Sequence, residues 1–305
     1  MTKEIASVYF VDGCAIERDF VYVASKADML DPMAYDFSRM FFNDRGEWVY
    51  HDLEWDVKSV CVRRSSMQRQ YVAMSIQGDV EFQFVGGSTV EKIPNAGTLN
   101  GAGAMMQVRE IGGQLLACGY GGQVYYRTSA GWVLLGGGLS RFESAERPVS
   151  LNSIDGSGLE NLYAVGNSGR IFHFDGESWS EIDSPTNVHL ERVRFAEGKA
   201  YICGNYGTVL QGDRKGFAVN PIGSFISHLW GIERYGGRTY VAHLSGLHAD
   251  DGIAWSAVNM GLDASGLPED GYRLDTFGGI LWSFGPKRVA YFDGIKWTAV
   301  PHPDN

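Results

Sequence analysis

The stretch Asp175-Gly176-Glu177-Ser178-Trp179-Ser180-Glu181-Ile182 decides the fold, because it returns twice further along the chain. The later copies are Asp251-Gly252-Ile253-Ala254-Trp255-Ser256-Ala257-Val258 and Asp293-Gly294-Ile295-Lys296-Trp297-Thr298-Ala299-Val300. Asp175 and Asp251 lie 76 residues apart, which is twice 38, and a diverged copy at the midpoint begins at Asp213. A fixed period near 40 in a strand-rich chain is typical of a repeat architecture, most often a β-propeller.

Each repeat can be divided into four strands. The second strand and the turn after it are clearest in Tyr163-Ala164-Val165-Gly166-Asn167-Ser168-Gly169, which is matched by Tyr201-Ile202-Cys203-Gly204-Asn205-Tyr206-Gly207. A third strand follows, such as 170–174, and then the Asp-Gly pair, which is the strongest short signal for a β-hairpin. The Trp after this pair opens the fourth strand, and its ring is large enough to seal one blade against the next.

The repeats predict an all-β, seven-bladed propeller of four-stranded antiparallel blades that occupies residues 1–305 as a single domain. The expected blades are an irregular first unit at about 5–53, followed by 56–93, 103–136, 150–183, 189–220, 228–259 and 271–301. The alternative is six blades plus an N-terminal cap formed by the first unit. The expected blade order closes the ring without exchange of a strand between the two ends, so closure depends on packing of the first blade against the last.

Charge and composition limit the kind of partner. The chain has 305 residues and a formal net charge of −10. An acidic surface repels phosphate backbones, so we expect no nucleic-acid partner and favour a protein with a basic surface. No apolar run approaches the roughly 20 residues needed to span a membrane. The first residues contain no apolar signal core, and the four cysteines form no Cys-x-x-Cys pair, so we expect a cytoplasmic protein with reduced thiols.

No catalytic motif is evident, and we predict a protein that is not an enzyme and holds no cofactor or metal. The sequence contains no Gly-x-Ser-x-Gly elbow, no His-Glu-x-x-His and no Walker phosphate loop. His189 and His228 begin first strands of adjacent repeats and are weak candidates for metal ligands. Acidic residues on or beside first strands leave a hydrolase or lyase with an active site in the channel as the alternative; these are Glu110, Asp155, Glu191, Glu233 and Asp275.

The remaining candidates are partner-binding residues, because Tyr, Trp and Arg dominate the hot spots of protein interfaces. On first strands, on turns after second strands and in one interruption of the period, they are Tyr120, Arg141, Phe142, Arg192, Arg194, Asn205, Tyr206, Trp230, Arg234, His243, Tyr272 and Arg273. A second group lies in an insertion into the first unit, at Met29, Leu30, Met33, Tyr35 and Phe37. Insertions in repeat proteins map to loops, often on the binding face.

The phrase Tyr-Ala-Val-Gly-x-x-Gly-x-Ile, followed by Asp-Gly-x-x-Trp, resembles the repeats of a widespread group of bacterial propellers related to BNR-like and WD40-like proteins. The resemblance covers about residues 103–301. It departs from the sialidase Asp-box, since Asp175 stands four residues before Trp179 rather than five, and it lacks the Gly-His and Trp-Asp signatures of WD40 units. Sialidase activity is therefore not carried over.

The resemblance implies a propeller with no fixed activity, and some proteins of this kind are immunity proteins that neutralise a secreted toxin. The resulting hypothesis is a non-catalytic binding module, most specifically a cytosolic immunity protein that docks on a toxin domain with a basic surface. Besides the channel hydrolase or lyase, the other alternative is a structural subunit of a phage or secretion assembly.

Overall fold

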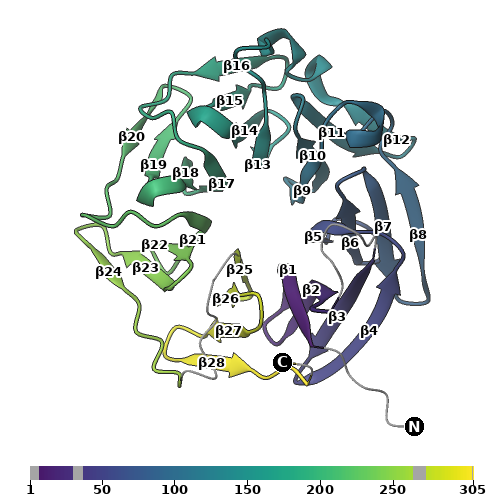
Figure 1. Ribbon diagram of the computed structural model, residues 1–305, viewed down its shortest axis with the longest axis vertical. Coiled ribbons are helices and arrows are strands. Elements are labelled where there is room, and N and C mark those ends of the chain that lie inside the picture. The colour runs from purple at the N-terminus through teal and green to yellow at the C-terminus, as the bar shows by residue number, and fades with distance from the viewer. Residues whose placement is uncertain (1–6, 30–36, 264–272, 304) are drawn as a thin grey trace.

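The protein forms seven four-stranded antiparallel sheets arranged in a ring, as seen in the computed structural model (Figure 1). The structure describes residues 7–29, 37–263, 273–303 and 305. Each sheet consists of four strands consecutive in the chain, and the first strand of each is innermost (Figure 1). The predicted seven-bladed propeller is therefore confirmed, and the first unit is a complete blade rather than a cap.

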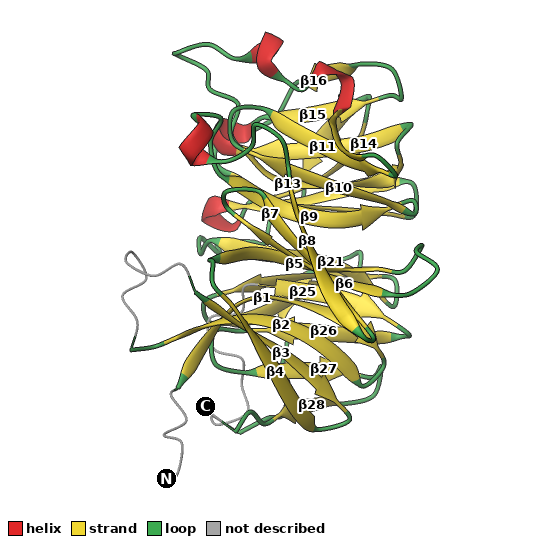
Figure 2. Ribbon diagram, turned by 90° about the vertical axis from the view of Figure 1, so that its right-hand side faces the viewer, coloured by secondary structure: helices red, strands yellow, loops and turns green. Residues whose placement is uncertain are grey.

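The blades follow one another around the ring in chain order, and Figure 2 shows them edge-on. The first three are β1(Val8–Glu17), β2(Phe20–Ala27), β3(Ser38–Asp44), β4(Glu47–Leu53); β5(Val57–Arg63), β6(Gln70–Ser75), β7(Asp79–Phe84), β8(Gly87–Lys92); β9(Met105–Ile111), β10(Gln114–Gly119), β11(Gln123–Thr128), β12(Gly131–Leu134). The next two are β13(Leu151–Gly158), β14(Asn161–Gly166), β15(Ile171–Phe174), β16(Trp179–Ile182); β17(Leu190–Ala196), β18(Lys199–Gly204), β19(Val209–Asp213), β20(Gly216–Val219). The last two are β21(Leu229–Tyr235), β22(Arg238–His243), β23(Gly246–Asp250), β24(Trp255–Ala257); β25(Arg273–Phe277), β26(Ile280–Phe284), β27(Val289–Phe292), β28(Trp297–Val300).

The described helices are short 3₁₀ turns between strands. They are η1(Thr98–Asn100), η2(Leu135–Gly137), η3(Ser140–Phe142), η4(Asn167–Gly169) and η5(Asn205–Gly207). Within the described ranges, no helix has the length and apolar character needed to cross a membrane.

The Asp of the repeated phrase builds the turn between the third and fourth strands. Asp175 Oδ1 accepts hydrogen bonds from the backbone N–H groups of Glu177 and Ser178, at 3.0 and 2.8 Å. Asp251 and Asp293 make the same pair of bonds in their blades, at 2.9 to 3.0 Å. An Asp side chain that satisfies the backbone two and three residues ahead fixes a tight turn, which explains why this residue recurs.

Two glycines of the other repeated phrase have different physical roles. A Cβ on Gly166 would lie 1.8 Å from the carbonyl oxygen of Ser150, so this residue allows the start of the first strand to pass close by. Gly169 instead has a φ of 73°, a conformation that glycine adopts without steric cost. Together they let the turn after the second strand lie against the neighbouring chain.

The core is divided among the blade interfaces. Seven apolar clusters of buried residues lie in the described structure, one between each pair of neighbouring blades. Cys14, Cys61, Cys118 and Cys203 are buried in these clusters as free thiols, and burial raises the pKa of Cys61 and of Cys118 to about 12. These cysteines therefore behave as small core residues with little thiolate at neutral pH.

The ring closes where the first blade meets the last. The N–H of Phe10 donates to the carbonyl oxygen of Pro286 at 2.6 Å, and Trp48 Nε1 donates to that of Pro301 at 2.8 Å. The His302 ring packs among those of Phe10 and Trp48, with ring centroids 5.2 and 4.5 Å away. Closure thus depends on side-chain packing and on a short segment after β28, without exchange of a strand.

We expect Trp48→Ala to weaken this closure and to lower the free energy of unfolding by about 2 kcal/mol, since it removes a partly buried ring and a hydrogen bond. Val49→Ala is the matched control, because Val49 is a neighbour on β4 and is 61% exposed. Urea unfolding followed by circular dichroism measures both variants. Equal stability of the two would show that the Trp48 contacts do not hold the ring together.

Candidate functional site

The first strands of the blades begin around a cavity of about 800 Å³, which we call the channel mouth. Its lining includes Lys58, Tyr120, His189, Glu191, Arg192 and Trp230. The structure therefore gathers three of the predicted partner-binding residues, Tyr120, Arg192 and Trp230, at one end of the channel. His189, predicted as a weak metal candidate, lies beside them.

Turns after second strands flank the channel mouth. The N–H of Asn205 donates to the carbonyl oxygen of His189 at 2.9 Å, which places the turn η5 beside this lining residue. Tyr206 at the centre of η5 is 64% exposed and has a φ of 56°. An exposed aromatic residue in a left-handed conformation is uncommon, and here it presents a large apolar and hydrogen-bonding side chain to solvent.

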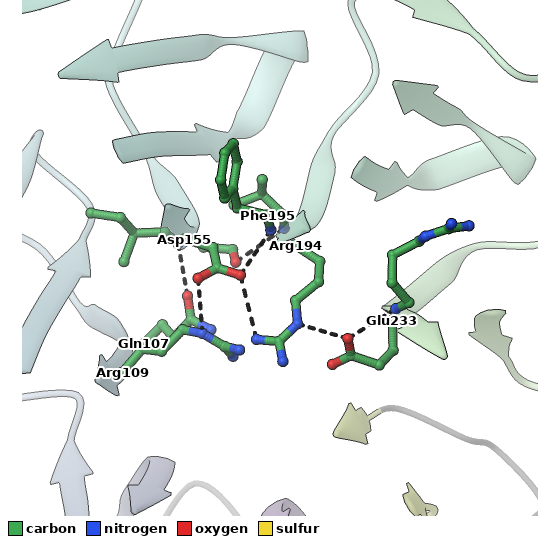
Figure 3. A network of polar contacts seen from close by, with 10 residues as sticks. Gln107, Arg109, Asp155, Arg194, Phe195 and Glu233 are labelled. Atoms are coloured by element: carbon green, nitrogen blue, oxygen red, sulfur yellow. Dashed lines mark hydrogen bonds and ion pairs between the residues drawn. The ribbon is translucent and has the colours of Figure 1, made fainter. Parts of the chain in front are cut away.

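Deeper in the channel, the acidic residues bind to arginines and to the backbone of other blades (Figure 3). Asp155 Oδ1 lies 3.2 Å from Arg109 Nε, and its Oδ2 accepts the N–H of Phe195 at 2.9 Å. Arg194 Nε lies 2.7 Å from Glu233 Oε1 and its NH1 lies 3.4 Å from Asp155 Oδ2 (Figure 3). Arg194, predicted as a partner-binding residue, is thus occupied by a network between blades.

Four of the five acids that were candidates for a channel active site make contacts of this kind with other blades. Asp275 Oδ2 accepts the N–H of Ala15 at 2.9 Å, and Glu110 Oε2 accepts that of Arg64 at 2.9 Å. Burial raises the pKa of Asp155 and that of Glu233, and for Glu233 the nearby Asp275 adds to the increase. Perturbed carboxyls can mark active sites, but here the partners of each group explain its position as a link between blades.

Other predicted binding residues also make contacts within the chain. Arg273 is buried with Nε 3.2 Å from Asp12 Oδ1, and Arg234 NH2 lies 2.7 Å from Glu197 Oε2. Arg141 donates to the carbonyl oxygen of Trp179. Phe142 packs against Phe172, Met29 is exposed and Phe37 is partly buried. Four of the predicted binding residues lie outside the described residues; they are Leu30, Met33, Tyr35 and Tyr272.

The histidines do not form a metal-binding group in the described part of the chain. His189 Nδ1 accepts the N–H of Ser168 at 3.1 Å, and the His228 ring lies 5.2 Å from that of Tyr206. His243 is buried with Nε2 2.9 Å from Nδ1 of His248. Among the described residues, no three His, Cys, Asp or Glu side chains are placed to hold an ion.

A larger groove of about 1230 Å³ runs along the outer strands β20 and β24. Its described lining contains neither Tyr nor Arg, and its one Trp, Trp255, donates from Nε1 to Asn220 at 3.1 Å. The channel mouth is the better candidate because it gathers the side-chain types that dominate binding hot spots.

Lys58 and Glu191 are among the residues of the mouth that the sequence did not predict as partner-binding. The sequence predicts no role for Lys58 and offers Glu191 only as an acid of a possible active site in the channel. Both occupy an irregular position near the start of a first strand, where the pairing with the second strand shifts by one residue. Lys58 and Glu191 occupy the same position when the repeats are aligned, and this could have indicated that they share a location. The shift in strand pairing that directs them to the mouth is visible only in the structure.

Comparison with known proteins gives one relative of nearly equal length. The chain is 28% identical over 309 aligned residues to Immune protein Tsi7 of Pseudomonas aeruginosa, and the alignment covers 98% of this chain and all of that protein. A comparison with protein families finds no match.

Solved structures show the same fold. The WD40 β-propeller domain of Doa1 is similar with a TM-score of 0.69 and 10% identity, over 96% of both chains. YCF48 bound to a D1 peptide is similar with a TM-score of 0.65 and 15% identity, over 92% of this chain and 90% of that one. At these identities the likeness concerns the fold alone.

Proposed function

We propose that this chain is an immunity protein, a non-catalytic propeller that binds a protein toxin and neutralises it. The observation that carries the proposal is the end-to-end similarity to Immune protein Tsi7. The contacts of four of the five channel acids support it, because carboxylates that hold neighbouring blades together are poorly placed to act as a catalytic pair; these four are Glu110, Asp155, Glu233 and Asp275.

We propose further that the toxin docks on the channel mouth and on the turns that flank it. Tyr120, Trp230 and the exposed Tyr206 supply aromatic surface there, and aromatic residues give large contact area with little loss of conformational entropy. The formal net charge of −10 favours a toxin domain with a basic surface and speeds its association. The site of action in this proposal is the bacterial cytoplasm.

The test begins with a tagged copy in its bacterial host, from which we expect capture of one basic protein at a one-to-one ratio. Expression of that protein alone should stop growth of a heterologous bacterium, and co-expression of this chain should restore it. Failure to restore growth would contradict the proposal, whatever the strength of binding.

A variant of the mouth locates the docking face. We expect Tyr206→Ser to weaken binding of the captured protein by roughly 30-fold, the effect of a hot-spot residue worth about 2 kcal/mol. Serine is chosen because Ser168 has the same conformation in the preceding blade, with a φ of 57° against 56°. The control is Ile295→Ala, since Ile295 is 89% exposed on an outer turn of the last blade. Equal binding by both variants would exclude this turn from the interface.

A further inference from the structure

Six of the first strands carry an extra residue near their start that lines the channel mouth. In these strands the pairing with the second strand shifts by one residue, which is the mark of a β-bulge. The extra residues are Val11, Lys58, Met106, Asn152, Glu191 and Trp230, and all six line the cavity of about 800 Å³. A bulge interrupts the regular alternation of side chains between the two faces of a strand. The side chains at the bulges therefore line the mouth instead of pointing to either face of their sheet.

The residue after each bulge links neighbouring blades in four successive cases. A side-chain oxygen at this position accepts the N–H of the next first strand. The bonds run from Val60 to Asp12 at 2.8 Å, Val108 to Ser59 at 3.3 Å, Ile154 to Gln107 at 2.7 Å and Val193 to Ser153 at 3.1 Å. The position therefore has a structural use that requires a hydrogen-bond acceptor.

Arg192 occupies the fifth position of this series and cannot play that part. A guanidinium has donors only, so it cannot accept the N–H of Ile232, the corresponding amide of the next blade. The side chain of Arg192 makes no hydrogen bond or ion pair with the described residues, and its Nε is buried without a partner. Leaving a buried charged donor unsatisfied is costly. The charges of Asp12 and Glu191 attract Arg192, but no described residue accepts a hydrogen bond from its Nε.

Lys58 lies in the same cavity and is a second cation without a hydrogen bond or ion pair among the described residues. Lys58 reaches the solvent of the mouth, yet the channel walls partly desolvate it. That desolvation, with repulsion from Arg192, lowers the pKa of its ammonium group. Burial, with repulsion from Arg273, lowers the pKa of Arg192 to about 9. Each cation is therefore less stable here than in water.

The negative groups nearby leave one positive charge in excess. Asp56, which also attracts Lys58, is paired with Lys26 at 2.7 Å. Asp12 is occupied by Arg273, by the N–H of Gly13 and by that of Val60. Glu191 lines the cavity, and its carboxyl group makes no hydrogen bond or ion pair with the described residues, although Arg192 and Lys58 lie close enough to lower its pKa against the effect of burial. The two cations and this one carboxylate would be balanced by a single monoanion. A phosphate dianion would make the cavity negative.

We propose that Lys58 and Arg192 form a binding site for one carboxylate group, supplied by an aspartate or glutamate side chain that the partner protein inserts into the channel mouth. That the carboxylate comes from a partner protein rests on the proposed function. The existence of a carboxylate-binding site does not rest on it. The protein has a net charge of −10, so a cationic pocket differs from the rest of its surface. An acidic side chain of an otherwise basic partner would fit only there, and this would fix the position of the partner on the docking face.

The first test uses the purified full chain and two peptides, acetyl-Gly-Glu-Gly-amide and acetyl-Gly-Gln-Gly-amide. We expect the Glu peptide to shift the NMR signal of the Arg192 Nε–H at low salt, and the Gln peptide to leave it unchanged. Lys58→Met should abolish this shift, whereas Lys215→Met, a change on an outer turn, should not. Arg192→Gln lacks the reporter group, so its titration is followed by the backbone amide signals of the mouth, and we expect it to abolish the shifts that the Glu peptide causes there in the wild type. Absence of binding to the wild type, or tighter binding of inorganic phosphate than of the Glu peptide, would overturn the carboxylate assignment.

The stability of Arg192→Gln separates a binding residue from a structural one. Glutamine can accept the N–H of Ile232 as Gln107 accepts that of Ile154. We therefore expect the Tm to rise by roughly 2–4 °C, the effect of one gained hydrogen bond in a chain of this size. A fall in Tm would show that Arg192 stabilises the fold, and would contradict the proposal.

The second test measures the affinity for the captured partner. We expect Lys58→Met and Arg192→Gln each to weaken it at least about tenfold, the effect of losing one charged hydrogen bond. Unchanged affinity together with peptide binding would overturn the partner as the source of the carboxylate and would point to a free small carboxylate. If the wild type captures no partner, the proposed function fails, and so does the assignment of the carboxylate to a partner protein. The peptide titration still decides in that case whether the carboxylate site exists.

Discussion

Replacement of Trp179 by alanine is expected to lower the free energy of unfolding by about 3–5 kcal/mol, the range for deletion of a large buried aromatic side chain. Trp179 is 2% exposed and lies in the apolar cluster between the third and fourth blades. Its Nε1 donates to the carbonyl oxygen of Leu135 at 3.1 Å, and its ring centroid lies 5.1 Å from that of Phe174. The substitution opens a cavity at this interface and removes one of the two hydrogen bonds to the carbonyl oxygen of Leu135, which keeps the bond from the N–H of Gly138 at 2.9 Å. Urea unfolding followed by far-ultraviolet circular dichroism measures the change.

Two control variants separate the ring from its N–H group. Trp179→Phe keeps most of the ring contacts and loses the hydrogen bond, so we expect it to cost about 1–2 kcal/mol less than alanine does. Glu177→Ala changes an exposed residue of the same hairpin and should stay within about 0.5 kcal/mol of the wild type. A loss of less than about 1 kcal/mol in Trp179→Ala would contradict the role of this residue in joining the blades.

The recurrence of Trp179 explains why the fold could be predicted from the sequence. In three blades the Trp near the start of the fourth strand donates its Nε1–H to the segment that leaves the preceding blade, from Trp179 to Leu135, from Trp255 to Asn220 and from Trp48 to Pro301. In the third blade the Trp132 ring is buried at the same position, although its Nε1 has no hydrogen-bond partner among the described residues. Burial of a Trp ring at the same place in several blades selects the same residue at the same spacing, and a repeat of this kind is visible in the sequence alone.

The channel mouth could be predicted only in part, because its residues do not repeat. Tyr120 and Trp230 were identified by residue type, and Arg192 by its place on a first strand. Lys58 was missed because a bulge, not the regular alternation of a strand, directs it into the cavity. The unpaired state of Arg192 could not be recognised from the sequence either, since it depends on groups from several blades that lie far apart along the chain.

Stability is expected to fall as the pH drops from 6.5 towards 4, because two buried histidines are held neutral by the fold. His243 is 3% exposed and His302 is 6% exposed. Burial lowers the pKa of each to about 4, from the ordinary value of 6.5, and for His243 the neighbouring His248 contributes. Between these two pKa values the unfolded chain binds a proton at each site that the folded chain does not, so stability rises with pH through this window. The loss is on the order of 3 kcal/mol for each histidine, and it is complete below about pH 4.

The variant His302→Phe should flatten this dependence, because phenylalanine keeps an aromatic ring among those of Phe10, Phe41 and Trp48 and does not titrate. Urea unfolding between pH 4.5 and 8 measures the effect, with the exposed His189 replaced by asparagine as the control. Identical slopes for the wild type and His302→Phe would contradict the prediction.

The difference between the two curves is the informative quantity, because other groups titrate in the same range with the opposite sign. Burial raises the pKa of Asp155 and that of Glu233, so the folded chain binds their protons more readily than the unfolded chain does. A falling pH therefore stabilises the fold through these carboxyls while it destabilises the fold through the histidines. Subtracting the His302→Phe curve from that of the wild type removes the carboxyl contribution, which is common to both, and leaves the contribution of His302 at the seam where the ring closes.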